Sequence, residues 1–386
     1  MAQDMPTLTA ALTGRVDTGN ALQEEQRLMA LRQQPHGAMV LDLKGLKYIS
    51  SAGLRVILRL RKLEADLSLV NASPLVYDIL ETTGFTQMMP VEKAHRSISV
   101  EGCPAIGRGA NGVVYRIASD AVVKVYDRPD CLPQVRRERQ LARKALVLGV
   151  PTAIPYDVVR VGERYGAVFE MLQAQSLSGL IAQSPQDLDR YVALYVELIQ
   201  HIHAIRVQPG ELPSMKELAL QWVRDLKPHL APEKGDKLEA LVAAAPDRDT
   251  LLHGDCHTNN VMLQGEEALI IDLDTLCVGH PLFELASMHM AYVGFGELNP
   301  EAVNAFLRLP AATAQLIWRK SLEGYLGCGG EGANQVEAKA MVLGYARLMR
   351  RTLRRGGLDT PQGRAQVALC RERLDGLLEQ VDSLDF

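Results

Sequence analysis

Strand-type and helix-type hydrophobic patterns alternate through the first 97 residues. Short apolar runs predict strands, and apolar residues that recur every three or four positions predict helices. We expect strands at 8–12, 38–43 and 67–70, and helices at 21–32, 52–63 and 74–84. Gly14 should end the first strand, and the nearly continuous apolar run 38–43 is typical of a strand buried on both faces. This alternation predicts an α/β domain with short connections.

The starts of these helices carry further signals. Ser50 and Ser51 stand directly before the second helix, so one of them should cap it by accepting a hydrogen bond from a free backbone N–H group. Pro74 suits the start of the third helix and Gly84 suits its end. The first helix should take its apolar face from Leu22, Leu28, Met29 and Leu31.

From about residue 98 the pattern changes to glycine-rich strands followed by helices. AIGRGANGVVYRI, residues 105–117, lies between β-type sequences, and AVVKVY, residues 121–126, is an apolar strand with Lys124 inside it. A helix is expected over 135–148, a strand over 165–172, and apolar helical periodicity over 188–245. This order predicts an α+β unit with a largely helical C-terminal part.

Composition narrows the class of protein. An apolar fraction of 47% and a charged fraction of 23% are typical of soluble globular chains. With a net charge of -4 no nucleic-acid partner is expected, and the basic run RLMRRTLRR, 347–355, should be the solvated face of a helix. We find neither a signal-peptide pattern in MAQDMPTLTA nor an apolar run of membrane-spanning length, so no membrane partner is expected. The six cysteines lack paired spacing, which indicates reduced thiols in a cytoplasmic protein.

The candidate chemistry centres on LLHGDCHTNNVM, 251–262, and ALIIDLDT, 268–275. Asn260 stands five residues after Asp255, and Asp272 ends an apolar strand. An acid, an amide and a second acid in this order suit phosphoryl transfer, because one carboxylate can accept a hydroxyl proton while the other oxygens hold Mg²⁺ against nucleotide phosphates. A polar loop that closes a β-hairpin is the alternative.

The glycines and the strand lysine support the same chemistry. Gly107, Gly109 and Gly112 form a GxGxxG pattern that no helix follows, which argues against a dinucleotide-binding fold. A lysine between valines is costly unless it is paired, and phosphates together with a helix carboxylate, Glu138, would pair Lys124. A solvent-facing lysine on an edge strand, and a Glu138 paired within its own helix, are the alternatives.

The segment VLDLKGLKYISSAGLRVILRL, followed by LVNASPLVYDILETTGF, resembles a STAS domain, the fold of anti-sigma factor antagonists. The resemblance implies a mixed sheet with helices, an anti-sigma-type protein partner, and a phosphorylated serine at Ser51. Ser50 replaces the acid that often precedes that serine, so Ser51 is equally interpreted as a helix cap. A phosphate there would meet the positive end of the helix dipole.

Residues 104–290 resemble the aminoglycoside phosphotransferase and choline kinase superfamily, which has the protein-kinase-like fold. This resemblance implies a catalytic base, Asp255, and two magnesium ligands, Asn260 and Asp272. His253 would buttress the catalytic loop, and Glu284 stands where the family usually has Asp. It further implies a nucleotide site made by Gly107, Gly109, Gly112, Lys124 and Glu138, with the adenine at the hinge Glu170 to Leu172.

Two departures from protein kinases favour a small-molecule acceptor. Gly254 stands where the HRD motif has arginine, and Asp272 lies only seven residues before Gly279, too close for a long peptide-docking segment. We therefore expect an α/β STAS domain at 1–97 and a bilobal kinase-like domain at 98–386, with lobes at about 98–172 and 173–386.

The expected function is that of a cytoplasmic phosphotransferase that uses ATP, or another nucleoside triphosphate, and Mg²⁺. Its acceptor would be a small hydroxylated compound or amino alcohol, walled in by the helices after Ala286. Two alternatives stay open. One is a partner-switching signalling protein whose kinase lobe phosphorylates Ser51 or a partner, and the other is a pseudokinase that senses nucleotide.

Overall fold

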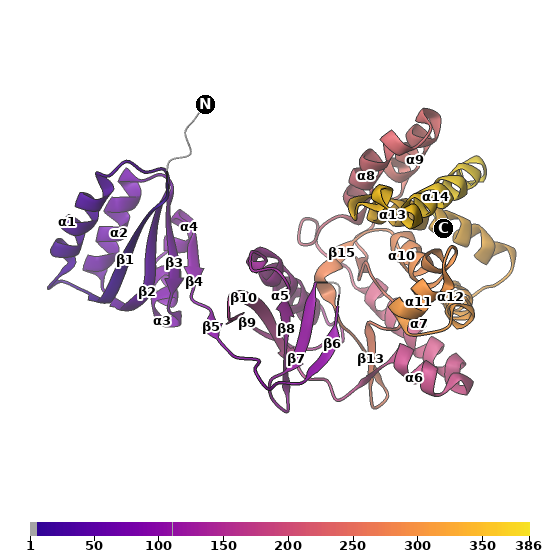
Figure 1. Cartoon of the computed structure of the whole chain (residues 1–386), viewed down its shortest axis with the longest axis horizontal. Helices are drawn as coiled ribbons and strands as arrows, with labels where there is room; N and C mark the ends of the chain where they lie inside the picture. The colour runs from indigo at the N-terminus through magenta and orange to yellow at the C-terminus, as the bar shows by residue number, and fades with distance from the viewer. Residues whose placement is uncertain (1–5, 110) are drawn as a thin grey trace. The chain divides into compact units, whose positions relative to one another are not determined.

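The computed structural model of the chain describes residues 6–109 and 111–386, so the first five of the ten N-terminal residues in which we found no signal peptide lie outside it. The chain divides into two compact units (Figure 1). The first comprises residues 1–99 with 159–162, and the second comprises residues 100–158 with 163–386. Among the helices of the described ranges, none combines the length and hydropathy that crossing a bilayer requires.

The first unit is built on a parallel sheet in the order β1-β2-β3-β4. Its strands are β1 (Leu8–Val16), β2 (Met39–Ile49), β3 (Leu67–Ala72) and β4 (Val91–Lys93). The connecting helices are α1 (Ala21–Arg32), α2 (Ser51–Leu63), α3 (Pro74–Thr82) and α4 (Phe85–Met88). All pairings of the described strands are parallel, where a mixed sheet was expected. The predicted α/β class is confirmed.

Three details of this unit differ from the sequence prediction. Burial alternates along β2, with Leu41 and Leu43 buried and Asp42 between them partly exposed, so only one face of the strand is fully covered. Gly14 does not end β1, because its φ of +66° accommodates a register shift and the strand continues to Val16. Leu22 is 68% exposed, so it does not contribute to the apolar face of α1.

The start of α2 separates the roles of two neighbouring serines. The Ser50 hydroxyl accepts a hydrogen bond from the Ala52 N–H at 3.2 Å, so Ser50 is the cap. Ser51 is the first residue of the helix and is exposed. The interpretation of Ser51 as the cap is therefore wrong.

The second unit begins with an antiparallel sheet in the order β9-β10-β8-β7-β6. These strands are β6 (Ala105–Arg108), β7 (Gly112–Arg116), β8 (Ala121–Tyr126), β9 (Pro155–Val161) and β10 (Arg164–Glu170). The helix α5 (Leu132–Val147) packs against β10. Residues 159–162 at the end of β9 group with the first unit, where β5 (Arg96–Ser97) pairs with them.

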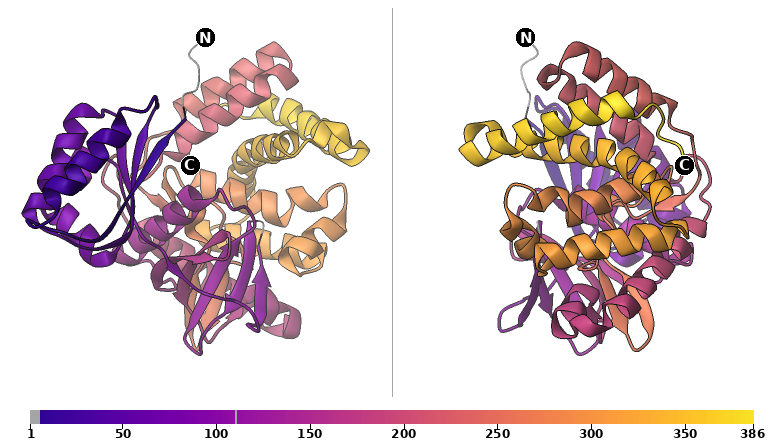
Figure 2. Two further views of the ribbon diagram at one scale, coloured as in Figure 1. Left: turned by 60° about the vertical axis from the view of Figure 1, so that its left-hand side comes forward. Right: turned by 90° about the vertical axis from the view of Figure 1, so that its right-hand side faces the viewer.

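Helices make up most of the remaining chain, as predicted. They are α6 (Leu177–Gln183), α7 (Leu188–Ala204), α8 (Met215–Leu226), α9 (Pro232–Ala244), α10 (Leu282–Tyr292), α11 (Pro300–Leu307), α12 (Ala311–Leu326), α13 (Glu331–Arg354) and α14 (Pro361–Gln380). Two small sheets lie among them: β11 (Gln175–Ser176) with β13 (Val261–Gln264) and β14 (Glu267–Ile270), and β12 (Leu251–Leu252) with β15 (Cys277–Val278). Figure 2 shows α13 beside α14, which it contacts.

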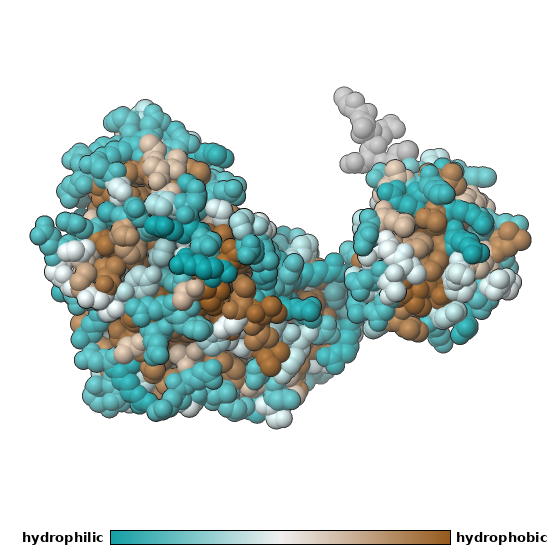
Figure 3. Space-filling model, turned by 180° about the vertical axis from the view of Figure 1, so that it is seen from behind, coloured by the Kyte–Doolittle hydropathy of each residue, from teal (hydrophilic) through white to brown (hydrophobic). Residues whose placement is uncertain are grey.

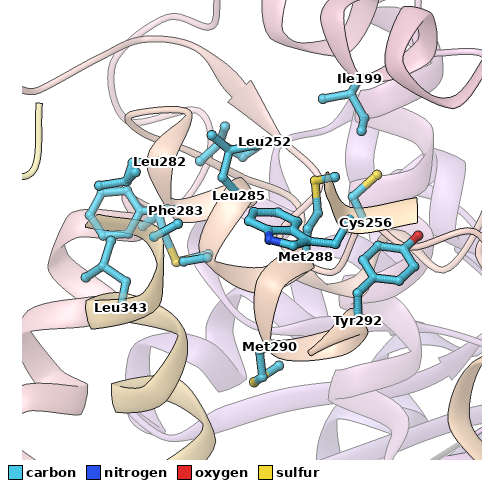
Figure 4. Packing of buried hydrophobic residues seen from close by; sticks show 14 of the residues in the cluster. Ile199, Leu252, Cys256, Leu282, Phe283, Leu285, Met288, Met290, Tyr292 and Leu343 are labelled. Carbon is cyan, nitrogen blue, oxygen red and sulfur yellow. The ribbon is translucent and has the colours of Figure 1, made fainter. Parts of the chain in front are cut away.

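Each unit has its own apolar core, and hydrophilic residues cover most of the surface seen in Figure 3. In the second unit the core surrounds α10, all of whose residues are buried. A helix that is buried all round must be apolar on every face, and Phe283, Leu285 and Met288 serve this purpose (Figure 4). Glu284 interrupts this apolar surface. A buried carboxylate needs compensating partners, and those partners lie in the candidate site.

Candidate active site

The loop of residues 253–260 connects β12 to β13 and carries Asp255 and Asn260. Buried Leu251 and Leu252 anchor its start, where they pair with β15. The Asp255 side chain is 32% exposed, so this carboxylate is open to solvent although the loop around it is largely buried.

Glu284 of α10 holds this loop in place through hydrogen bonds. Its carboxylate accepts hydrogen bonds from the backbone N–H groups of His253 at 2.6 Å, Gly254 at 3.0 Å and Cys256 at 3.2 Å. Burial works to raise the pKa of Glu284, but the imidazoles of His203 and His253 and the Gly254 N–H group outweigh it and lower the pKa to about 2. The carboxylate therefore stays ionised and fixes the backbone on both sides of Asp255.

Gly254 is required by the shape of the loop. Its φ is +82°, and a Cβ atom added there would lie 2.5 Å from the Thr275 carbonyl oxygen. The Thr275 hydroxyl also donates to the His253 carbonyl at 2.8 Å. A side chain such as the arginine of the HRD motif therefore has no room at this position.

His253 joins the loop to the segment that carries Asp272. Its Nδ1 accepts a hydrogen bond from the Asp255 N–H at 3.2 Å, so the ring proton lies on Nε2 and faces the Ile271 carbonyl at 3.1 Å. Asn260 adds a second connection. Its side-chain N–H donates to the Asp255 backbone carbonyl at 3.1 Å, and its backbone carbonyl accepts from the Ile271 N–H at 2.9 Å. This orientation leaves the amide oxygen of Asn260 for a ligand.

Lys124, Glu138 and Asp272 form one ionic cluster. The Lys124 Nζ atom lies 2.9 Å from Glu138 Oε1 and 2.6 Å from Asp272 Oδ1. Burial acts to lower the pKa of Lys124, but the charges of Glu138 and Asp272 raise it overall, so the lysine is a cation. Asp272 has a left-handed backbone with φ of +65°, which is costly for a non-glycine residue and is concentrated at functional sites.

The donor atoms here fit a hard divalent cation. Asp272 and Asp274 lie on one short turn, and burial together with the negative charge of Asp272 raises the pKa of Asp274. A local excess of carboxylate oxygens, with the amide oxygen of Asn260, is the ligand chemistry that Mg²⁺ prefers. Asn260 and Asp272 are the residues that would hold it.

The predicted nucleotide residues line the neighbouring sheet. Gly107 and Gly112 lie on the β6–β7 hairpin, where the Gly109 N–H donates to the Gly112 carbonyl at 3.0 Å; residue 110 between them lies outside the described residues. A Cβ atom at Gly112 would lie 2.1 Å from the Val125 carbonyl, so only glycine fits there. A Cβ atom at Gly107 would make only an ordinary contact with Val114 at 3.8 Å, and at Gly109 the space is open, so these two glycines have no such packing reason.

The hinge residues sit at the end of β10. The Glu170 side chain accepts a hydrogen bond from the Ile154 N–H at 3.2 Å, so its carboxylate is used within the protein. Leu172 is buried in an apolar cluster with Ala153 and Leu269. An apolar surface of this kind suits a planar base such as adenine.

Comparison with known proteins places both parts of the chain. Residues 102–316, more than half of the chain, match the phosphotransferase enzyme family known as APH. The chain belongs to this family. Residues 3–98 match the STAS domain, and BtrV of Bordetella bronchiseptica, which is named as an anti-sigma factor antagonist, is 37% identical over 105 residues that cover 26% of this chain and 90% of BtrV. The predicted combination of a STAS domain with an APH phosphotransferase domain is confirmed.

Solved structures show the fold of the APH domain. A thermostable mutant of aminoglycoside phosphotransferase APH(4)-Ia without ligand aligns with a TM-score of 0.50 at 15% identity, over 72% of this chain and 94% of that one. A variant of it in ternary complex with ADP and hygromycin B aligns with a TM-score of 0.51 at 15% identity, over 72% and 96% of the two chains. At this identity the likeness concerns the fold of the APH domain alone.

The sequence prediction missed two groups beside Asp255 in the APH domain. Arg347 of α13 donates from Nη1 to the Gly254 carbonyl at 2.6 Å, so the basic run 347–355 is not simply a solvated face. The sequence carried a signal for this contact, because the apolar residues Leu348 and Met349, which directly follow Arg347, are buried. His257 is buried with Nε2 at 3.8 Å from Asp255 Oδ2. Its position two residues after Asp255 could have indicated this contact.

We predict that Glu284→Gln destabilises the APH domain at pH 7 by about 3 kcal/mol, because the depressed pKa of the carboxylate measures its stabilisation by the fold. That contribution is fully present above the unfolded-state pKa of about 4.5 and is lost as the pH falls toward about 2. The difference between wild type and variant should therefore shrink through this range. Denaturation followed by fluorescence measures it, since both tryptophans, Trp222 and Trp318, belong to the second unit.

A matched control is Glu379→Gln, because Glu379 forms an exposed ion pair with Lys234. This change should alter the free energy of unfolding by no more than about 0.5 kcal/mol. A Glu284→Gln variant whose destabilisation is the same at pH 7 and at the acid end of the range would show that the charge of Glu284 does not hold the loop.

Proposed function

We propose that the APH domain transfers the γ-phosphoryl group of ATP, or of another nucleoside triphosphate, to a hydroxyl group of a small molecule in a Mg²⁺-dependent reaction. The observation that supports this most strongly is the bonded path from Asp255 through His253 and Asn260 to Ile271, next to the Asp272–Lys124 ion pair. In this proposal the domains run from 1–97 and 98–386, with the nucleotide between lobes at about 98–172 and 173–386.

The nucleotide would lie along the β6–β7 hairpin and the hinge. Gly107, Gly109 and Gly112 would cover its phosphates, and Lys124, held by Glu138, would contact them. The hinge from Glu170 to Leu172 would receive the base. APH(4)-Ia is described in complex with ADP. We therefore expect a nucleotide to bind at the corresponding place in this fold.

When bound, Mg²⁺ would neutralise charge on the nucleotide phosphates. Asp272 and Asn260 would supply protein oxygens to it, and Asp272 would exchange its contact with Lys124 for this role. Lys124 would keep Glu138 as its partner while it reaches the phosphates. The intact set Lys124, Asp255, Asn260 and Asp272 argues against a pseudokinase.

Asp255 would orient the acceptor hydroxyl and take its proton. As the hydroxyl oxygen forms a bond to the γ-phosphorus, the bond from that phosphorus to the bridging oxygen of the nucleotide breaks, and the proton passes to the Asp255 carboxylate. The exposure of this side chain, 32%, suits contact with an external hydroxyl. The rigid backbone on either side suits a group whose task is positioning.

The segment after Asp272 favours a small acceptor over a protein. Residues 273–275 form a short 3-10 helix, and Cys277–Val278 returns at once to pair with β12. No long activation segment is present in this part of the chain to dock a peptide. Gly254 also leaves no arginine to bind a phosphorylated loop.

We predict that Asp255→Asn lowers kcat by roughly 10²- to 10⁴-fold while nucleotide affinity stays within about twofold of wild type, because an amide keeps the shape but cannot accept the proton. Steady-state turnover and calorimetry with AMP-PNP measure the two quantities. Asp249→Asn is the control, since Asp249 is 58% exposed and contacts Arg206. Equal losses of turnover and nucleotide binding in a folded Asp255 variant would make this aspartate structural.

We predict that Asp272→Ala removes most of the Mg²⁺ dependence of nucleotide binding, because it deletes a carboxylate ligand and leaves Lys124 paired with Glu138. Calorimetric titration of AMP-PNP with and without Mg²⁺ is the measurement, and Asp255→Asn serves as the comparison because it should keep the dependence. A Mg²⁺ effect of wild-type size in the Asp272 variant contradicts the assignment.

The STAS domain supports a second proposal. We propose that it binds a protein partner of the anti-sigma type, and that phosphorylation of Ser51 switches this binding. Ser51 is exposed at the first position of α2, where free N–H groups and the helix dipole favour a phosphate. Because Ser50 already caps the helix, the Ser51 hydroxyl is not needed for that purpose. The kinase of this serine would be a partner enzyme or the APH domain itself.

We predict that Ser51→Asp leaves the thermal unfolding of the full chain nearly unchanged but alters partner binding or phosphotransfer, since the added charge falls on an exposed position. Ser50→Asp is the matched control, because Asp is also a good cap. Labelled ATP followed by peptide mapping tests transfer to Ser51 by the chain itself. Absence of label at Ser51, together with a Ser51→Asp variant that is silent in both assays, would contradict a switch at this serine.

A further inference from the structure

The basic run at the end of α13 lies against the loop that carries Asp255. Arg347 donates to the carbonyl of Gly254 at 2.6 Å, and the Ser287 hydroxyl donates to the same oxygen at 3.2 Å. Gly254 directly precedes Asp255, so the Arg347 guanidinium is fixed beside the proposed base. The ring of Trp222, 5.5 Å from the guanidinium carbon, supports it from one side.

Arg351 lies one helical turn further along the same face. Its guanidinium carbon is 4.8 Å from the ring centre of Phe295, and Phe295 meets Phe306 edge-on at 5.1 Å. Phe306 in turn meets His257 at 4.7 Å, and His257 Nε2 lies 3.8 Å from Asp255 Oδ2. An unbroken row of contacts therefore leads from Arg351 back to Asp255.

Within the described residues, neither Arg347 nor Arg351 has a carboxylate within 4.0 Å. Arg350 between them does, because it contacts Asp225 at 2.6 Å. Glu297, two residues after Phe295, forms an ion pair with Arg373 and accepts a hydrogen bond from the Tyr345 hydroxyl. Burial and the neighbouring Arg355 lower the pKa of Arg351 while Asp255 acts to raise it, so the two charges are close enough to interact. Beside the proposed base, these two partly buried cations thus form no direct ion pair within the described residues.

We propose that the acceptor of this phosphotransferase is an anionic hydroxylated molecule, whose carboxylate or phosphate group binds Arg347 and Arg351 while its hydroxyl faces Asp255. A partly buried guanidinium is costly without a partner, and its planar fork matches the oxygens of carboxylates and phosphates. The same pair repels ammonium groups. The acceptor would therefore differ in charge from aminoglycosides, which are polycations, and from choline.

This inference rests on the proposed phosphoryl transfer, whose products would be the phosphorylated acceptor, the nucleoside diphosphate and one proton. The full chain with Mg²⁺ and ATP should be assayed by ADP release on two matched series. One is glycerol, glycerate, glycerol 3-phosphate and ethanolamine, and the other is glucose, gluconate, glucose 6-phosphate and glucosamine. The carboxylate and phosphate members separate the two sources of negative charge.

In at least one series the anionic members should exceed the neutral member in kcat/KM by tenfold or more, and the amine should be the poorest. Arg351→Gln should raise the KM for the anionic acceptor by about 10- to 100-fold, as expected for a lost charge-assisted hydrogen bond, and leave the KM for ATP unchanged. Arg351→Lys should restore part of the loss. Arg350→Gln is the matched control on the same helix and should leave the acceptor KM unchanged.

Calorimetry with the same compounds and Mg²⁺·AMP-PNP gives a second readout. Anion binding that weakens at least tenfold in Arg351→Gln supports the inference even without turnover. The inference is overturned if amines are used or bound as well as anions, if Arg351→Gln affects all acceptors alike, or if no anionic compound is used or bound at millimolar concentration. Asp255-dependent phosphoryl transfer to the hydroxyl groups of ethanolamine or glucosamine would then leave the proposed function intact. Anion binding without Asp255-dependent transfer to any acceptor would contradict the proposed function alone.

Discussion

Three backbone N–H groups of the loop that carries Asp255 point at one buried carboxylate, that of Glu284. Glu284 belongs to α10, the helix buried on every side within the largest apolar core. These hydrogen bonds attach the loop, which is neither helix nor strand, to a helix that the core holds in place. A buried charge of this kind is tolerated only when N–H groups compensate it, so the core helix and the loop fold as one unit.

The other contacts of the site depend on this fixed backbone. With the loop in place, Gly254 closes against the Thr275 carbonyl, and His253 reaches the Ile271 carbonyl that directly precedes Asp272. The left-handed backbone of Asp272 then presents its carboxylate to Lys124. Cations also approach from α13, where Arg347 donates to the Gly254 carbonyl. A negative site edged by basic groups is the charge distribution that phosphate chemistry requires.

The sequence predicted the helices and strands well wherever a segment shows a single hydrophobic periodicity, either that of a helix or that of a strand. Helix α1 has the expected bounds, and Lys124 is interior to a strand as its valine neighbours indicated. The prediction failed where tertiary contacts decide. Gly14 continues a strand through a bulge, and the basic run 347–355 faces a loop 93 residues away. Nothing in the local sequence shows that Asp272 takes a left-handed backbone, because the surrounding fold imposes that conformation.

A crystal structure of the full chain with Mg²⁺ and AMP-PNP would test the central claim most directly. The quantities to measure are the oxygen ligands of the metal and the distance between Lys124 Nζ and Asp272 Oδ1, which is 2.6 Å in the present structure. We predict that oxygens of Asn260 and Asp272 ligate the metal, that Lys124 leaves Asp272 for the nucleotide phosphates, and that Glu284 keeps its three N–H partners. A complex in which Asp272 stays paired with Lys124 and the metal binds elsewhere would contradict the account.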